Sequence, residues 1–114
     1  MKSMSELIII NNEFMGKGND ELGKTLTGVF LRKLWAQEKK PDTIILYNSA
    51  VKLIAEGSEV LDAMDGLYSS GADILACGTC VDFYNLKNSI KIGRVSNMEE
   101  ICSLLMQAEK VITI

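Results

Sequence analysis

The chain has 114 residues, a formal net charge of −3 and a hydrophobic fraction of 47%. This length and apolar content predict a single domain over residues 1–114 with one core. The acidic balance, without a prominent run of Lys or Arg, argues against nucleic acid and against an anionic membrane as partners. A domain this small cannot bury all of its apolar surface, which predicts a homo-oligomer.

The N-terminal sequence and the cysteine content indicate the compartment. Residues 1–6 do not show a basic start followed by a long apolar stretch, and the apolar run at residues 7–10 is too short for a signal peptide or a membrane span. We therefore expect a cytoplasmic protein, in which the three cysteines are free thiols or redox groups and not a disulfide framework. The chain has no histidine, so a four-ligand zinc site would need a carboxylate, and we expect neither a metal nor a cofactor.

Apolar runs and helical spacings alternate along the chain. Leu7–Ile10 is a continuous apolar run, which suits a parallel strand buried on both faces. Asn19 is expected to cap the first helix, because two acidic residues follow it and apolar residues then recur at helical spacing. Those apolar residues are Leu22, Leu26, Val29, Phe30 and Leu34. The expected strands span residues 7–10, 43–47, 73–76, 92–96 and 111–114, and the expected helices begin near residues 20, 49, 58, 80 and 97.

This strict alternation of strand and helix contains no hairpin turn signal. It predicts an α/β fold in which helices cover both faces of a parallel sheet. Sites in such folds lie at the carboxyl ends of the strands. Three loops are expected to meet there, namely residues 11–18, 48–51 and 77–80.

One segment fits a phosphate-binding pattern that we reject. Gly18–Thr25 matches G-x-x-x-x-G-K-[ST], but it does not follow the first strand directly. Asp20 and Glu21 would also place negative charge where a phosphate should bind. The helical spacing puts Gly23 and Lys24 inside a helix, so we interpret the segment as an acid-capped helix with a glycine at a close contact.

The sequence Cys77-Gly78-Thr79-Cys80 lies where a predicted strand ends and a predicted helix begins. Only a thiolate is nucleophilic, and a helix N-terminus favours the thiolate. Gly78 permits close approach of the backbone, which favours a chemical role for the pair. The alternative is that both cysteines are small buried hydrophobic residues. For Cys102, on the last predicted helix, packing is the better interpretation.

Two chemistries compete for this cysteine pair. A thioredoxin-like dithiol normally follows an early strand and faces a cis-proline, whereas this pair follows the third strand and the one proline, Pro41, follows the first helix. Persulfide chemistry instead needs an accessible thiolate of low pKa and a pocket of N–H donors. Without histidine, Lys52 or the helix N-terminus would have to lower the thiol pKa.

Polar residues at the strand ends have open interpretations. Asn11, Asn12 and Asn48 could donate hydrogen bonds to an anion or a persulfide, or could simply end their strands. Lys52 could lie beside the cysteine pocket, or it could form a solvated pair with Glu56 four residues later.

Several segments together resemble the DsrE/DsrF-like domain of the YedF selenium-metabolism proteins, in order and at the expected spacing from about Leu7 to the C-terminus. The resemblance implies a three-layer α/β/α domain with a five-stranded parallel sheet, usually assembled into homo-oligomers. The segments that match are Gly16–Gly23, Leu46–Asn48, Val51–Leu53, Glu56–Ser58, Cys77–Cys80 and Gly93–Met98.

DsrE-like proteins of sulfur relays carry sulfur as a cysteine persulfide, which the resemblance places on Cys77 or Cys80. YedF-type proteins usually have an N-terminal SirA/TusA-like domain, and this chain starts at the DsrE-like part, so we expect a separate donor or acceptor protein. The alternatives are an oligomeric binding module with incidental cysteines and a redox dithiol. The candidate catalytic residues are Cys77 and Cys80, and the candidate pocket residues are Asn11, Asn12, Gly16, Gly18, Asn48, Lys52, Gly78 and Thr79.

Overall fold

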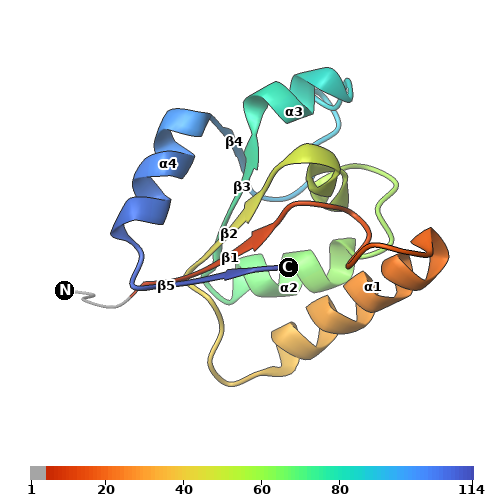
Figure 1. The fold of residues 1–114 in the computed structure, drawn as a ribbon, viewed down its shortest axis with the longest axis horizontal. Coiled ribbons are helices and arrows are strands. Elements are labelled where there is room, and N and C mark those ends of the chain that lie inside the picture. The colour runs from red at the N-terminus through yellow and green to blue at the C-terminus, as the bar shows by residue number, and fades with distance from the viewer. Residues whose placement is uncertain (1–4) are drawn as a thin grey trace.

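The computed structural model describes residues 5–114. Five strands form one parallel sheet in the order β4–β3–β2–β1–β5 (Figure 1). The strands are β1 (Glu6–Ile10), β2 (Thr43–Leu46), β3 (Asp73–Cys77), β4 (Arg94–Ser96) and β5 (Lys110–Thr113). The helices are α1 (Asp20–Ala36), the 3-10 helix η1 (Asn48–Ile54), α2 (Leu61–Ser69), α3 (Gly78–Phe83) and α4 (Met98–Gln107). Within residues 5–114, no helix is both long and apolar enough to cross a membrane.

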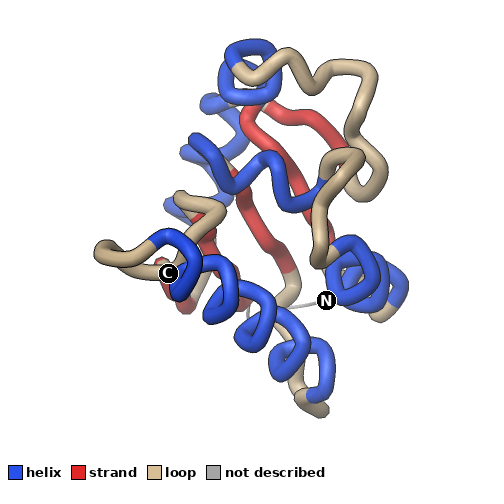
Figure 2. Tube along the Cα trace, turned by 90° about the vertical axis from the view of Figure 1, so that its right-hand side faces the viewer, coloured by secondary structure: helices blue, strands red, loops and turns tan. Residues whose placement is uncertain are grey.

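Helices cover both faces of the sheet (Figures 1 and 2). Side chains of a strand point alternately to opposite faces, and β1 divides its residues accordingly. Ile8 and Ile10 pack in one core cluster with residues of α1 and α2, while Leu7 and Ile9 pack in the other with Ile101 of α4. The three-layer α/β/α architecture with five parallel strands is therefore as predicted.

Helix α1 confirms its predicted cap but buries an unexpected face. Asn19 Oδ1 accepts the Leu22 N–H at 2.8 Å, and Gly23 lies inside the helix. The buried residues are Gly23, Thr27, Gly28 and Leu31, whereas Leu22, Leu26 and Val29 are exposed. Small residues allow the helix to approach the preceding loop closely, since a Cβ on Gly23 would lie 2.8 Å from the Phe14 Cβ. The apolar spacing therefore located the helix, and Phe30 and Leu34 do pack against the core, but it missed the small residues at the closest contact.

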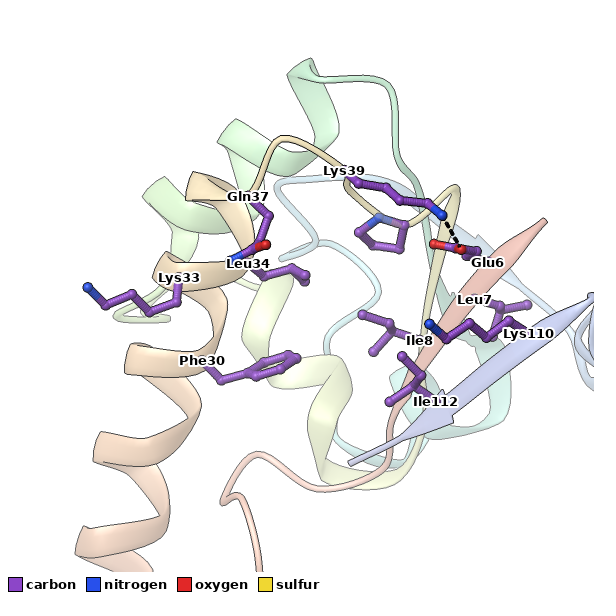
Figure 3. A pocket seen from close by; sticks show the side chains of 11 residues that line it. Glu6, Leu7, Ile8, Phe30, Lys33, Leu34, Gln37, Lys39, Lys110 and Ile112 are labelled. Atoms are coloured by element: carbon purple, nitrogen blue, oxygen red, sulfur yellow. Dashed lines mark ion pairs between the residues drawn. The ribbon is translucent and has the colours of Figure 1, made fainter. Parts of the chain in front are cut away.

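The packing of α1 on α2 depends on one aromatic contact. The Trp35 indole lies against the backbone of Gly66, where an added Cβ would come within 2.1 Å of the ring. Edge strand β5 is left largely uncovered, with Val111 and Ile112 about 40% exposed. A groove of about 420 Å³ separates α1 from β5, and Figure 3 shows Phe30, Leu34, Ile8 and Ile112 converging on it.

Strand β4 begins at Arg94 and not at Ile92 as predicted. Gly93 explains the difference, because it adopts φ +77° and an added Cβ there would lie 2.3 Å from the Ile74 carbonyl oxygen. The backbone at Gly93 turns against β3 before the strand pairing begins at Arg94.

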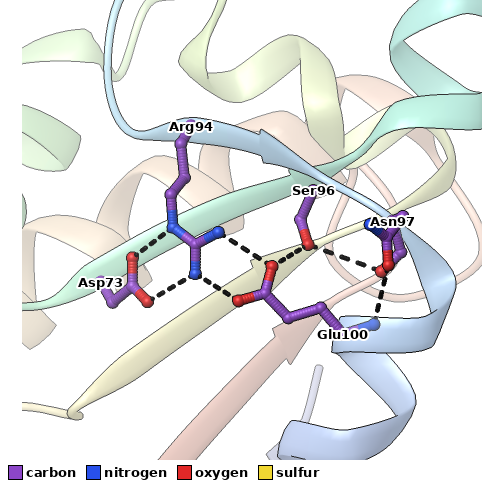
Figure 4. A network of polar contacts seen from close by, with 5 residues as sticks. All are labelled: Asp73, Arg94, Ser96, Asn97 and Glu100. Atoms are coloured by element: carbon purple, nitrogen blue, oxygen red, sulfur yellow. Dashed lines mark hydrogen bonds and ion pairs between the residues drawn. The ribbon is translucent and has the colours of Figure 1, made fainter.

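A cluster of four polar side chains, which we call the Arg94 cluster, joins β3, β4 and α4 (Figure 4). The Arg94 guanidinium donates to both carboxylate oxygens of Asp73, at 3.1 and 2.9 Å, and to both of Glu100, at 2.8 Å each. The Ser96 hydroxyl also donates to Glu100. These contacts lower the pKa of Glu100 to about 2, with Arg94 as the main cause, and raise the pKa of Arg94.

Candidate functional site

The two cysteines of the motif lie at the junction of β3 and α3 but differ in exposure. Cys77 ends β3 as a buried residue, 2% exposed, and its side chain packs in the core cluster of Ile101. Cys80 is the third residue of α3 and is partly exposed. Solvent therefore reaches Cys80 but hardly reaches Cys77. Cys102 is exposed on α4, so the prediction that it packs in the core is wrong.

Gly78 allows the turn between the two cysteines to pack closely. An added Cβ on Gly78 would lie 2.8 Å from the Ser96 carbonyl oxygen at the end of β4. The close backbone approach expected at this glycine is present. Helix α3 begins at Gly78 and not near Cys80 as predicted, so Cys80 lies within the first helical turn, and Thr79 before it is exposed.

Asn48 supplies a hydrogen-bond donor to the sulfur of Cys80. Its backbone N–H donates to Cys80 Sγ at 3.0 Å, from the segment that follows β2. Asn48 has φ +55°, a conformation that asparagine tolerates better than most residues. Its side-chain Oδ1 accepts the Tyr84 hydroxyl at 3.1 Å, which ties Asn48 to the end of α3.

Lys52 joins this arrangement through Tyr84. Its ammonium lies 4.5 Å from the centroid of the Tyr84 ring and 3.2 Å from Glu13 Oε2. The alternative pair of Lys52 with Glu56 does not form, because η1 ends at Ile54 and Glu56 lies beyond this helix. Glu56 instead pairs with Lys91 at 3.9 Å. We call Cys80, Asn48, Tyr84, Lys52 and Glu13 the Cys80 cluster.

The loop after β1 reaches the same end of the sheet. Ser49 Oγ accepts the Glu13 N–H at 3.0 Å and donates to Asn12 Oδ1 at 3.3 Å. Contacts therefore link residues of all three loops that were predicted to meet. Asn11 is exposed just after β1, and added Cβ atoms on Gly16 and Gly18 would meet no atom within 4 Å. These two glycines adopt positive φ in the turns before α1 and do not pack against the thiols.

The environment of Cys80 raises the pKa of its thiol. Burial is the largest cause, the neighbouring Cys77 thiol adds to it, and the Asn48 N–H opposes both. The lowered thiol pKa that the sequence led us to expect is therefore wrong for this chain. The hydrogen bond from Asn48 favours the thiolate but does not offset the desolvation.

Three members of the site were missed by the sequence analysis: Tyr84, Ser49 and Glu13. Tyr84 lies four residues after Cys80, so the two occupy one face at the end of α3. That spacing was a usable signal. The pairing of Glu13 with Lys52 had no signal in the sequence, because it depends on how the loop before α1 folds back toward η1.

A larger hollow lies beside the Cys80 cluster. It measures about 840 Å³ and lies between α1 and the segment from η1 to Val60, with Lys52 and Glu13 in its wall. Two ion pairs lie in its wall, Lys24 with Glu59 at 3.0 Å and Lys52 with Glu13 at 3.2 Å. Among residues 5–114, no three side chains of the metal-binding types His, Cys, Asp and Glu gather as a possible metal site.

Comparison with solved structures places this geometry in a known fold. The structure superposes on ychN from E. coli, a DsrE/DsrF-like protein, with a TM-score of 0.74 over 97% of this chain and 99% of that one. The chain has the ychN fold. The sequence identity to ychN is 18%, which shows the fold alone.

Two proteins of unknown function share the ychN fold. MTH1491 from Methanobacterium thermoautotrophicum gives a TM-score of 0.71 at 17% identity, over 97% of this chain and 99% of that one. BT1422 from Bacteroides thetaiotaomicron gives 0.63 at 20% identity, over 96% and 95%. No protein-family model matches the sequence, and no curated protein matches it.

Proposed function

We propose that this protein is a persulfide carrier of the DsrE/DsrF-like type and that Cys80 holds the sulfur. The observation that supports this most is the pairing of a partly exposed thiol with a backbone donor from another strand end, the Asn48 N–H. The ychN fold and the resemblance of the Cys77–Cys80 motif to YedF-type domains support the same assignment.

The proposed reaction is a sulfur transfer that needs no cofactor. The Cys80 thiolate attacks the outer sulfur of a donor persulfide, a new S–S bond forms at Sγ, and the donor leaves as a thiolate. An acceptor thiolate then attacks the outer sulfur on Cys80 and releases the Cys80 thiolate. The N–H of Asn48 stabilises the anionic sulfur at the start and at the end of this cycle.

The partners of the reaction follow from the resemblance to YedF-type proteins. We propose a separate SirA/TusA-like protein as donor or acceptor, a role in selenium metabolism, and a homo-oligomeric assembly. Formation of the assembly would cover apolar surface such as β5, whose Val111 and Ile112 are exposed in the single chain.

Intact-mass spectrometry tests the carrier directly. The purified protein would be incubated with glutathione persulfide as wild type and as Cys77→Ser, Cys80→Ser and Cys102→Ser. Immediately after loading, we expect a reducible adduct of one sulfur atom on all forms except Cys80→Ser, with Cys102→Ser as the matched control at an exposed thiol. An adduct that persists in Cys80→Ser and vanishes in Cys77→Ser would move the carrier to Cys77.

A non-catalytic oligomeric binding module is the second candidate. The raised pKa of the Cys80 thiol favours it, because a protonated thiol is a poor nucleophile. This candidate predicts no sulfur adduct on any form and slow alkylation of Cys80 at neutral pH. Both results together would replace the carrier proposal.

A further inference from the structure

We propose that Cys77 is a resolving thiol, which unloads an undelivered persulfide from Cys80 by forming a Cys77–Cys80 disulfide. This inference rests on the proposed carrier function of Cys80 and adds a reaction to it. It gives a role to a buried nucleophile that the transfer reaction does not use.

The placement of Cys77 decides which partner it can attack. Its side chain is 2% exposed, so external donors and acceptors hardly reach it. Cys80 lies three residues further on, in the first turn of α3, and the Cys77 thiol is close enough to raise the pKa of the Cys80 thiol. Cys80 packs against the same core cluster that contains Cys77. The reaction partner that the structure offers to Cys77 is therefore the sulfur of Cys80.

The reaction balances without an external oxidant. The Cys77 thiolate attacks Cys80 Sγ, the S–S bond to the outer sulfur breaks, and hydrosulfide leaves with the electron pair. The proton lost by Cys77 goes to solvent or to the leaving hydrosulfide. The Cys77 sulfur is oxidised to the disulfide level, Cys80 Sγ keeps its oxidation state, and the outer sulfur is reduced to hydrosulfide. A dithiol reductant then returns the pair to its reduced form.

Two backbone contacts restrain Cys80 and the turn that joins it to Cys77. The Asn48 N–H fixes Cys80 Sγ from one side, and the packing of Gly78 on the Ser96 carbonyl fixes the turn between the cysteines. Delivery to an acceptor and attack by Cys77 consequently compete for the same persulfide. A loaded protein that meets its acceptor delivers the sulfur. A loaded protein that meets no acceptor forms the Cys77–Cys80 disulfide.

The test follows the fate of the loaded protein in the Cys102→Ser background. After loading with glutathione persulfide and removal of the excess, intact mass and released hydrosulfide would be recorded over time. We expect the adduct to convert to a form two hydrogen atoms lighter than the reduced protein, with one hydrosulfide per chain. In the added variants Cys77→Ser and Cys77→Ala, the adduct should persist at least about tenfold longer.

Two variants at Cys77 separate chemistry from packing, because serine and alanine fill the buried position differently. Thermal unfolding would confirm that each is folded under the assay conditions. The resolving role would be overturned if the sulfur adduct decayed equally fast with and without Cys77, or if no disulfide between Cys77 and Cys80 were found. Cys80 would then remain the proposed carrier. Absence of any adduct on Cys80 would overturn both proposals.

Discussion

The two ends of β3 carry two polar clusters of opposite design. At its start, Asp73 belongs to the Arg94 cluster, where a guanidinium bridges two carboxylates through paired hydrogen bonds. At its end, Cys77 leads to the Cys80 cluster, where each link is a single contact and the last donor meets a thiol. In the first cluster one guanidinium is shared by two carboxylates, while the second holds a polarisable sulfur near solvent.

This difference separates a structural role from a chemical one. Paired, charge-assisted hydrogen bonds fix geometry and leave little capacity for a ligand. A chain of single contacts orients its terminal group and leaves it able to react. We therefore expect substitutions in the first cluster to change stability and substitutions in the second to change thiol chemistry.

The largest expected effect is on stability, at the glycine that precedes Arg94. Gly93→Ala should lower the free energy of unfolding by about 3 kcal/mol, because it combines positive φ with a clash against the Ile74 carbonyl oxygen. Gly57→Ala is the matched control, since Gly57 has φ +93° with open space around it and should cost about 1 kcal/mol. Denaturant unfolding measures both, and equal losses would show that the packing of Gly93 on β3 contributes nothing.

Arg94→Met should lower the free energy of unfolding by about 1 kcal/mol, a modest loss because the pairs are about 40% exposed and screened by solvent. It leaves Asp73 and Glu100 without their shared cation. The rate of Cys80 alkylation should not change. Arg32→Met on α1 is the control for removing an exposed arginine. An altered alkylation rate in Arg94→Met would mean that the two ends of β3 are coupled.

The acid stability of the Arg94 cluster follows from Glu100. Its pKa in the folded protein is about 2, below the ordinary value of about 4.5. The stabilisation is therefore fully present above pH 4.5 and is lost as the pH falls toward 2. Glu100→Gln should flatten this part of the curve of stability against pH. An unchanged curve in Glu100→Gln would assign the acid sensitivity to other carboxylates.

The smallest expected effect on stability comes from Tyr84→Phe, at about 0.5 kcal/mol. The variant keeps the ring beneath Lys52 and removes the hydroxyl that anchors Asn48. If Asn48 is held less firmly, its N–H stabilises the Cys80 thiolate less. The pH midpoint of Cys80 alkylation should therefore rise, and it would be measured in the Cys102→Ser background. Tyr68→Phe, at an exposed tyrosine of α2, should leave the midpoint where it is. A midpoint that falls in Tyr84→Phe would contradict this role for Asn48.

The sequence was sufficient to predict the α/β fold, because buried parallel strands are continuous apolar runs and Asn19 and Asn97 are recognisable caps. The prediction of which residues of α1 are buried was wrong in part, because their burial depends on close packing. The exposed Leu22 and Leu26 look like core residues until Gly23 and Thr27 are seen to face the protein. Apolar spacing cannot show that small residues lie at the closest contact.

The candidate site was predicted in its location but not in its electrostatics. Convergence of the loops at the carboxyl ends of the strands follows from topology, and the link from Asn48 to Cys80 fulfils it. The raised pKa of the Cys80 thiol could not be predicted, because it depends on how far α3 buries the sulfur. The partners of Lys52 likewise depend on where η1 ends, since Glu56 lies beyond it, and on how the loop that carries Glu13 folds back.

The contact between Trp35 and Gly66 gives the molecule a built-in optical probe. Trp35 is the only tryptophan of the chain, so indole emission reports the separation of α1 from α2. Thiol accessibility of Cys77 reports the opening of the junction between β3 and α3. If both signals change at the same denaturant concentration, the layer of α1 and α2 and the cysteine junction unfold as one cooperative unit.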